Sequence, residues 1–192
     1  LLTIAVISII AVISAILIWR ALTPTGKVIT IDDLHRLNLE GKLDPDEGYI
    51  YNGFSFVKHH GMWYTQVKLG NVLLNLPLHF GPRDLEDIPV KGRINDRFKQ
   101  RVVYIAFDPE DSGMNYIAVA AAELSATLAQ GLELIPKPAC TKNITEACKT
   151  RPILNCSNKE KAIIFINHVD NENETVVELK GNCIEVKGKG MN

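Results

Sequence analysis

Residues 101–131 read RVVYIAFDPEDSGMNYIAVAAAELSATLAQG, and this stretch determines the fold class. Its first eight residues are almost continuously apolar, as expected of a central strand buried on both faces. Residues 114–130 then carry apolar side chains three and four positions apart, which predicts an amphipathic helix. Asp111 and Ser112 are suitable caps at its start, and Gly131 is a natural end. A strand followed by a helix predicts one half of a β-α-β unit.

Strand patterns lie on both sides of this helix. Residues 132–135 predict a short parallel strand that completes the β-α-β unit. Three further strands are predicted after it, at residues 161–167, 175–179 and 182–187. Before residue 101, an antiparallel meander of three strands is predicted at residues 49–57, 62–69 and 72–80. Pro77 places the last of these at a sheet edge or interrupts it, and residues 81–92 are interpreted as a linker.

The predicted class is therefore α+β: a transmembrane helix followed by a mixed-sheet ectodomain with an antiparallel meander, one β-α-β unit and disulfides near the C-terminus. The expected divisions are a transmembrane helix, a stalk or connector with a short helix near Leu34, and one extracytoplasmic domain. These cover residues 1–22, 23–47 and 48–192, with the meander at 48–80 and the β-α-β unit and disulfide-bearing strands at 101–187.

The transmembrane prediction rests on residues 1–19 (LLTIAVISIIAVISAILIW), which contain no charged residue. In helical geometry this run spans about 28 Å, close to the hydrocarbon thickness of a bilayer. Trp19 and Arg20 follow at the position of an interfacial aromatic and a snorkelling cation. The lipid bilayer is therefore the first predicted partner. Because the sequence begins at Leu1, we expect further residues before it, and the ending at Asn192 is interpreted as a truncation or a free tail.

Four cysteines, Cys140, Cys148, Cys156 and Cys183, lie in the last third of the chain. None belongs to a C-x-x-C pair, so their spacing does not favour zinc or redox chemistry. An even number of clustered cysteines behind an anchor predicts two disulfides in an oxidising compartment. Of the three pairings, we favour Cys140 with Cys148 and Cys156 with Cys183.

Three N-glycosylation sequons begin at Asn143, Asn155 and Asn173. Asn155 is the least suited to modification, because its neighbour Cys156 is predicted to be bridged. Sequons interleaved with cysteines predict a glycoprotein, and with the N-terminal helix they predict a protein that crosses the cell membrane once. The N-terminus is expected in the cytoplasm and the C-terminal domain outside.

Charge and motifs exclude several classes of function. Lys and Arg number 21 against 22 Asp and Glu, so no net field draws in nucleic acid. The nucleophile elbow, the phosphate-binding loop and the H-E-x-x-H motif are all missing from the sequence, so no catalytic residue, metal or cofactor is predicted. Glu123 occupies a mid-helix position that a catalytic acid could hold, but we interpret it as part of a solvated face. The carboxylates of Asp108, Glu110 and Asp111 are interpreted as complements of the helix dipole rather than as a calcium site.

Two further polar clusters are also interpreted as structural rather than functional. His59 and His60 are interpreted as polar loop residues, because adjacent strand residues face opposite sides of a sheet. The basic side chains between residues 91 and 101 are interpreted as a solvated connector. Their alternative is contact with anionic lipid or a cell-surface polymer.

The cysteine region ACTKNITEACKTRPILNC (residues 139–156), followed by GNCIEV (residues 181–186), resembles uncharacterised single-pass membrane proteins of small-genome archaea. The resemblance covers roughly residues 104–186, and its cysteine spacing is the most specific part. It implies a location in the cell envelope and no assigned activity. At its N-terminus the chain also resembles archaeal type IV pilin-like proteins, whose mature chains begin with an apolar helix.

Two classes of function are predicted, with a third as an alternative. The first is an anchored domain that binds or scaffolds at the cell envelope, through a protein partner or through self-association. The second is a pilin-like filament subunit with residues 1–22 in the filament core. An envelope enzyme of unknown reaction is the third alternative.

Overall fold

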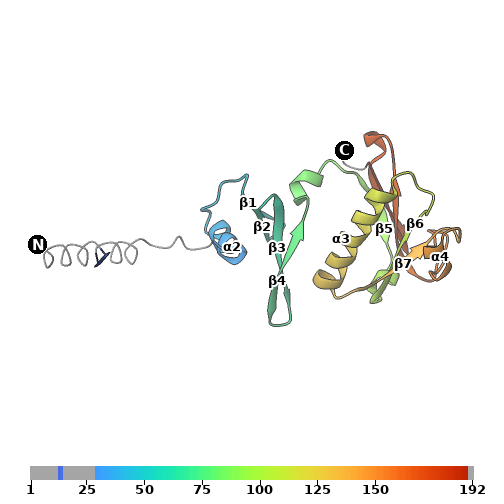
Figure 1. Ribbon diagram of the computed structural model, residues 1–192, viewed down its shortest axis with the longest axis horizontal. Coiled ribbons are helices and arrows are strands. Elements are labelled where there is room, and N and C mark those ends of the chain that lie inside the picture. The colour runs from blue at the N-terminus through green and yellow to red at the C-terminus, as the bar shows by residue number, and fades with distance from the viewer. Residues whose placement is uncertain (1–12, 15–28, 190–192) are drawn as a thin grey trace, which may run out of the picture.

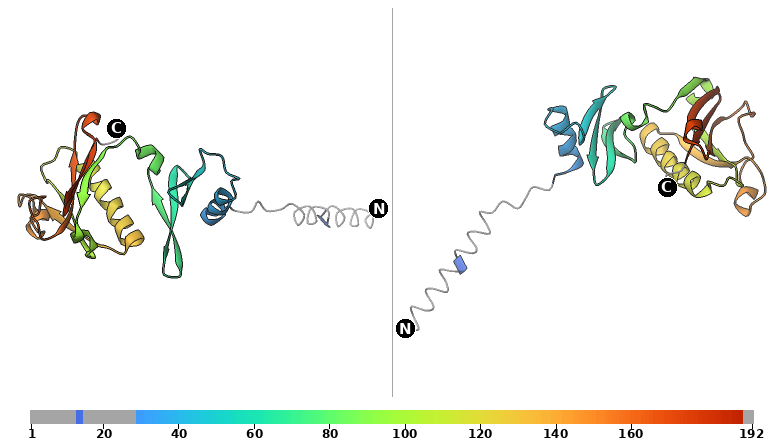
Figure 2. Two further views of the ribbon diagram at one scale, coloured as in Figure 1. Left: turned by 180° about the vertical axis from the view of Figure 1, so that it is seen from behind. Right: turned by 90° about the horizontal axis from the view of Figure 1, so that it is seen from above.

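The computed structural model describes residues 13–14 and 29–189 of the chain, and it is α+β as predicted. It contains two separate sheets rather than one, with helix α3 lying between them (Figures 1 and 2). The elements of the first sheet are β1 (Gly48–Tyr51), β2 (Phe54–His59), β3 (Met62–Leu69) and β4 (Val72–Leu78). Those that follow are η1 (Pro82–Leu85), β5 (Val90–Ile94), η2 (Asp96–Lys99), β6 (Val102–Phe107), α3 (Met114–Leu132), β7 (Ile135–Cys140), α4 (Glu146–Lys149), β8 (Ala162–His168), η3 (Glu172–Glu174), β9 (Val176–Gly181) and β10 (Cys183–Gly188).

The first sheet is an antiparallel meander of four strands in sequential order, whereas three were predicted. The first predicted strand is divided by a tight turn at Asn52 and Gly53, both of which have positive φ angles of 48° and 84°. An Asn-Gly pair is the preferred sequence for such a two-residue hairpin turn. Pro77 lies in β4 at the edge of this sheet, in agreement with the prediction.

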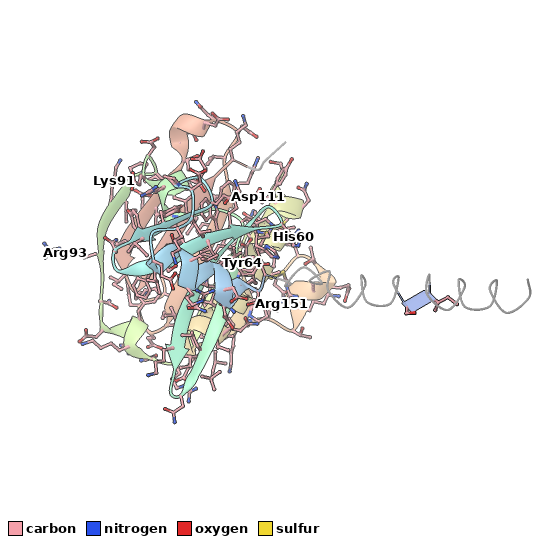
Figure 3. The ribbon with its side chains drawn as sticks, turned by 90° about the vertical axis from the view of Figure 1, so that its left-hand side faces the viewer. His60, Tyr64, Lys91, Arg93, Asp111 and Arg151 are labelled. Atoms are coloured by element: carbon pink, nitrogen blue, oxygen red, sulfur yellow. A yellow bond between two sulfur atoms is a disulfide. The ribbon has the colours of Figure 1, made fainter. Side chains whose placement is uncertain are left out.

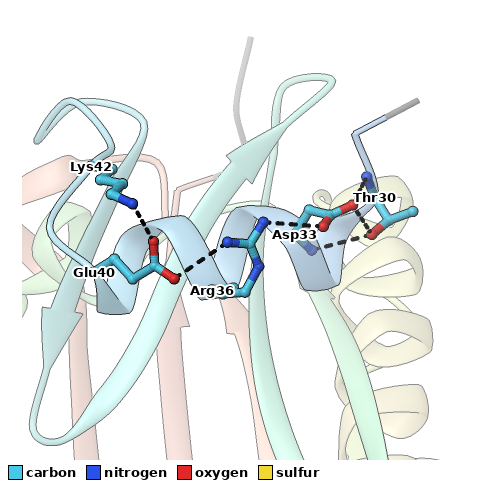
Figure 4. A network of polar contacts seen from close by, with 5 residues as sticks. All are labelled: Thr30, Asp33, Arg36, Glu40 and Lys42. Atoms are coloured by element: carbon cyan, nitrogen blue, oxygen red, sulfur yellow. Dashed lines mark hydrogen bonds and ion pairs between the residues drawn. The ribbon is translucent and has the colours of Figure 1, made fainter. Parts of the chain in front are cut away.

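Helix α2 (Ile31–Leu39) begins at a capping box in which Thr30 and Asp33 bond each other's backbone N–H groups. Arg36, Glu40 and Lys42 continue this row of polar contacts along the exposed side of the helix (Figure 4). The opposite side packs on β1 and β2. The structure therefore attaches residues 31–39 to the first sheet, whereas the sequence predicted that they belong to a stalk or connector.

Polar side chains make this attachment. His35 and Asn38 are buried, with exposed fractions of 1% and 7%. The amide of Asn38 donates to the carbonyl oxygens of Tyr49 and Phe56 and to Ser55 Oγ. The Nδ1 atom of His35 lies 2.8 Å from Ser55 Oγ. Burial lowers the pKa of His35, while the charge of Asp32 partly opposes that shift.

The second sheet has six strands in the order β5-β9-β10-β8-β6-β7. Strands β10, β8, β6 and β7 run parallel to one another, whereas β9 is antiparallel to β10 and β5 is parallel to β9. The sheet is therefore mixed, and β6, α3 and β7 form the predicted β-α-β unit. The last strand of that unit begins at Ile135, three residues later than predicted, because α3 continues to Leu132 and Glu133 then takes a left-handed conformation.

Helix α3 covers one face of the second sheet. Its residues Ile117 and Leu128 pack against Val103, Ile105 and Ile164. The helix begins after Gly113, without a side-chain cap, so the predicted caps are not used as caps. Asp111 instead accepts a hydrogen bond from the backbone N–H of Gly113.

Disulfides and a loop cover the other face of the second sheet. The two bridges join Cys140 to Cys148 and Cys156 to Cys183, as predicted. Leu154 and Cys183 pack there against the fully buried Ile163. Because α3 lies on the opposite face, the region containing the disulfides supplies the second layer of this core.

The two end strands of the second sheet differ in their free backbone groups. In β7 the N–H groups of Ile135 and of Thr141, which follows the strand, bond to the carbonyl oxygens of Arg101 and Phe107 beside β6. The alternate positions, which face outward, include Pro136 and Pro138, and proline has no N–H. The N–H of Cys140 bonds to Pro152. The β7 edge therefore offers no free N–H at these three outward positions.

The predicted transmembrane helix falls on residues 1–22 and so lies outside the described residues, apart from Ile13 and Ser14. Trp19 and Arg20, the predicted interfacial pair, also lie outside them. Within the described part of the chain, no helix has both the length and the apolar character required to cross a membrane.

Candidate functional site

The carboxyl ends of the parallel strands β6, β8 and β10 lie along one edge of the second sheet. From β6 the chain continues through α3 to β7 on one side of β6, whereas β8 and β10 lie on the other side. In open sheets of this kind, ligands bind at such a point. Here Asp111 joins the β6–α3 loop to the end of β8, because its Oδ1 accepts from the N–H of Gly113 at 2.8 Å and its Oδ2 from the N–H of His168 at 3.2 Å. The ring of Tyr116 stacks on that of His168, with centroids 5.9 Å apart. These contacts hold the β6–α3 loop and the start of α3 against the end of β8.

The neighbouring carboxylates, those of Asp108 and Glu110, both form ion pairs with one lysine. The Nζ atom of Lys142 lies 3.0 Å from Asp108 and 2.7 Å from Glu110. Partial burial acts to raise the pKa of Asp108, but the N–H of Glu110 and the ammonium of Lys142 outweigh it and lower that pKa. Among the described residues, no group of three histidine, cysteine or acidic side chains is placed to hold a metal ion.

A pocket of about 420 Å³ lies between α3 and strands β6 and β7. This volume falls in the usual range for small-molecule sites. Its walls are small or apolar, and the residues that define its shape are Phe107, Ala118, Ala121, Ala122, Pro136 and Pro138. The space lies beside the alanines of α3, whose side chains are too small to fill it.

Arg151 is the charged residue among the described residues that line this pocket. Its guanidinium lies 5.7 Å from the centroid of the Phe107 ring. Within the part of the chain that the structure describes, Arg151 makes no ion pair with a carboxylate. The pocket therefore combines an apolar interior with one cation that has no counter-ion.

Sequence reasoning missed this pocket. Residues of α3, β7 and the loop after α4 come together only through the fold, so no local motif marks them. The two prolines of β7, Pro136 and Pro138, are the strongest signal in the sequence, because alternating prolines place two rings on one face of a strand.

Glu123 has a partner that was not predicted. Its Oε2 lies 2.8 Å from Nδ1 of His79, and its Oε1 accepts a hydrogen bond from the N–H of His79 at 3.2 Å. Glu123 is therefore paired rather than simply solvated. Because His79 follows β4, this pair connects the first sheet to α3. A cavity of about 180 Å³ beside it is lined by residues of both elements.

The remaining predicted sites are dispersed. His59 and His60 stand at the β2–β3 turn with their rings 4.0 Å apart. Asn143 and Asn155 are exposed, and Asn155 Oδ1 accepts from Ser157 Oγ at 2.5 Å within its own sequon. Asn173 lies in η3. The structure brings none of these described residues to the pocket.

Comparisons with known proteins add no relative: no family model, curated protein or solved structure matches the chain. The pocket containing Arg151 is the candidate site, because it combines a mostly apolar hollow of about 420 Å³ with a cation that can orient a ligand.

Proposed function

We propose that this chain is an anchored binding domain of the cell envelope, held in the membrane by residues 1–22 and displayed outside the cytoplasm. Two disulfides and exposed sequon asparagines support the location, because bridged cysteines persist in oxidising compartments. The resemblance of residues 104–186 to archaeal single-pass membrane proteins supports the same placement.

The pocket between α3 and β7 carries the proposal of binding. An apolar interior favours a hydrophobic body, whereas Arg151 favours a negative group at one end of it. The ligand class that fits both features is a small amphiphile with an anionic end, such as a carboxylate on an apolar chain or ring. A neutral molecule of the same shape leaves the guanidinium without a counter-ion.

The test is calorimetric titration of the full chain in zwitterionic nanodiscs with 6-phenylhexanoate, with empty nanodiscs as the blank. We expect saturable binding of the carboxylate. The matching alcohol should bind at least about tenfold more weakly, because a hydrogen bond to a charged group contributes about 1.5–3 kcal/mol. Arg151→Gln should remove that difference between carboxylate and alcohol.

A matched pair of variants controls for partition into lipid. Ala122→Phe places a ring at the wall of the pocket and should abolish binding, whereas Val119→Phe lies on the same helix at an exposed position outside the lining. Equal binding by both variants would contradict the pocket as the site.

Placement is tested separately, with a C-terminal tag and protease added to intact cells. Complete loss of the tag is expected for a domain displayed outside. A protected tag contradicts the proposed orientation, and recovery of the chain in filaments sheared from cells would favour the pilin-like subunit instead.

A further inference from the structure

Strand β5 ends the second sheet on the side opposite β7, and its outer edge has free backbone groups. The N–H of Val177 bonds to the carbonyl of Pro89, and the N–H of Asn95 bonds to the carbonyl of Gly181. Because hydrogen-bonding direction alternates along a strand, the odd-numbered residues of β5 face β9. The N–H and C=O groups of Val90, Gly92 and Ile94 therefore face outward.

This edge is exposed and carries no proline. All five residues of β5 are exposed, including Val90 at 64% and Ile94 at 50%. Edge strands are normally shortened, bulged, covered, interrupted by proline or given charged side chains, because a free edge accepts further strands. The β7 edge is protected by its prolines, whereas β5 carries only the charges of Lys91 and Arg93, which repel a basic strand and attract an acidic one.

The side chains of β5 form two distinct faces. Val90 and Ile94 lie on the face of the sheet that α3 partly covers. A groove of about 690 Å³ on that face includes Val177, the register partner of Val90. Lys91 and Arg93 lie on the other face and extend from the outer edge of the molecule (Figure 3). A segment added here meets an apolar face and a basic face.

The basic face has unsatisfied charge. Lys180 and Lys187 each contact both Glu178 and Glu185, so these four residues of β9 and β10 neutralise one another. The other two cations of β5, β9 and β10 are Lys91 and Arg93, and neither forms an ion pair with a described residue. A complementary strand therefore carries acidic side chains on this face.

Gly92 stands at the centre of β5. Its φ is +91°, and a Cβ atom there would lie 2.2 Å from the carbonyl oxygen of Leu179, so the position requires glycine. That contact is with β9, so the pairing inside the sheet fixes glycine at this position.

We propose that β5 binds an extended, acidic segment of a partner protein by strand addition, with alternating apolar and acidic residues. A second copy of this chain is a poor occupant, because antiparallel pairing centred on Gly92 sets Lys91 of each copy directly opposite Arg93 of the other. Like charges in that position are destabilising. The proposal is independent of the ligand pocket, which lies at the β7 end of the sheet.

The test measures fluorescence anisotropy of a labelled peptide of alternating valine and glutamate, titrated with the full chain in zwitterionic nanodiscs. Two further peptides carry N-methyl groups on the valines only or on the glutamates only. In a strand these two sets of N–H groups point in opposite directions, so only one set faces β5. We expect one methylated peptide to bind at least about tenfold more weakly than the other. Equal binding by the two would overturn strand addition.

Charge reversal provides the second arm. The double variant K91E/R93E changes two exposed residues outside the core and should weaken the glutamate peptide about tenfold, while binding a valine–lysine peptide that the native protein does not bind. Lys99→Glu, an exposed lysine on η2, is the matched control and should leave both affinities unchanged.

Three results contradict the proposal. The first is a glutamate peptide that does not bind. The second is binding that responds to charge reversal but not to N-methylation, which indicates plain ionic attraction of the kind expected for anionic lipid. The third is concentration-dependent self-association through β5 without peptide, which makes a second copy the occupant.

Discussion

Replacing Cys156 and Cys183 together by alanine should lower the free energy of unfolding by about 3.5 kcal/mol, the larger of two expected disulfide effects. The two residues are 27 apart in sequence, and loop-closure entropy in the unfolded chain gives a loss of this order. Cys183 is fully buried beside Ile163, so the bridge also fixes the second layer of the core. Urea unfolding followed by far-ultraviolet circular dichroism measures the loss.

The other bridge is the internal control. Cys140 and Cys148 are eight residues apart, and the same relation gives about 2.5 kcal/mol for their removal. A larger loss for the short loop than for the long one would contradict the entropic account.

Protein alkylated directly from membranes, before reduction, should contain no free thiol, and labelling of two or more cysteines would contradict the oxidising location.

Acidification should weaken the attachment of α2 to the first sheet through His35. Burial lowers the pKa of His35 in the folded state below its unfolded value of about 6.5, so the unfolded chain takes up the proton first as the pH falls. The stability contribution is complete above pH 6.5 and decreases below it, toward the folded-state pKa. The limiting slope for one proton is about 1.4 kcal/mol per pH unit.

Trp63 makes this loss measurable, because it is buried in the first sheet beside Tyr49 and Phe56. In a Trp19→Phe background Trp63 is the sole tryptophan, and its fluorescence follows the unfolding of that sheet in urea. The urea midpoint should stay constant above pH 7 and fall between pH 6.5 and 5.

Two histidine variants distinguish the source of this pH dependence. His35→Leu places a non-titrating, apolar side chain of similar size at the buried position and should flatten the dependence. His60→Asn, at an exposed turn with positive φ, should leave it as it is. An unchanged pH profile in His35→Leu would assign the effect to another group.

The parts of the fold that follow from local pattern could be predicted. The apolar strand at residues 102–107 and the amphipathic helix after it were correct in type, and so was the parallel direction of the next strand. Both disulfide pairings were correct, because short separations and neighbouring predicted strands left few compact alternatives.

The missed features have particular physical causes. The division of β1 from β2 was readable from Asn52 and Gly53 and was overlooked. Strand β5 was assigned to a linker because no residue in it is buried, so its sequence has no core pattern. The attachment of α2 was missed because its contact residues, His35 and Asn38, are polar and usually exposed.

The candidate sites depend on distant contacts that a single sequence does not encode locally. Arg151 reaches the α3–β7 pocket across the loop after α4, and His79 reaches Glu123 from the other sheet. Each pair of elements is separated by a full strand or helix, so only the tertiary fold makes them neighbours.

The unequal ends of the second sheet determine how many partners it can accept through its backbone. Pro136, Pro138 and the bond from Cys140 to Pro152 close the β7 end to further pairing at these positions, whereas β5 remains open. Strand addition to the second sheet therefore has a valence of one at these two edges. A partner strand that occupies β5 completes the sheet, and head-to-tail growth through these two edges stops at the first addition.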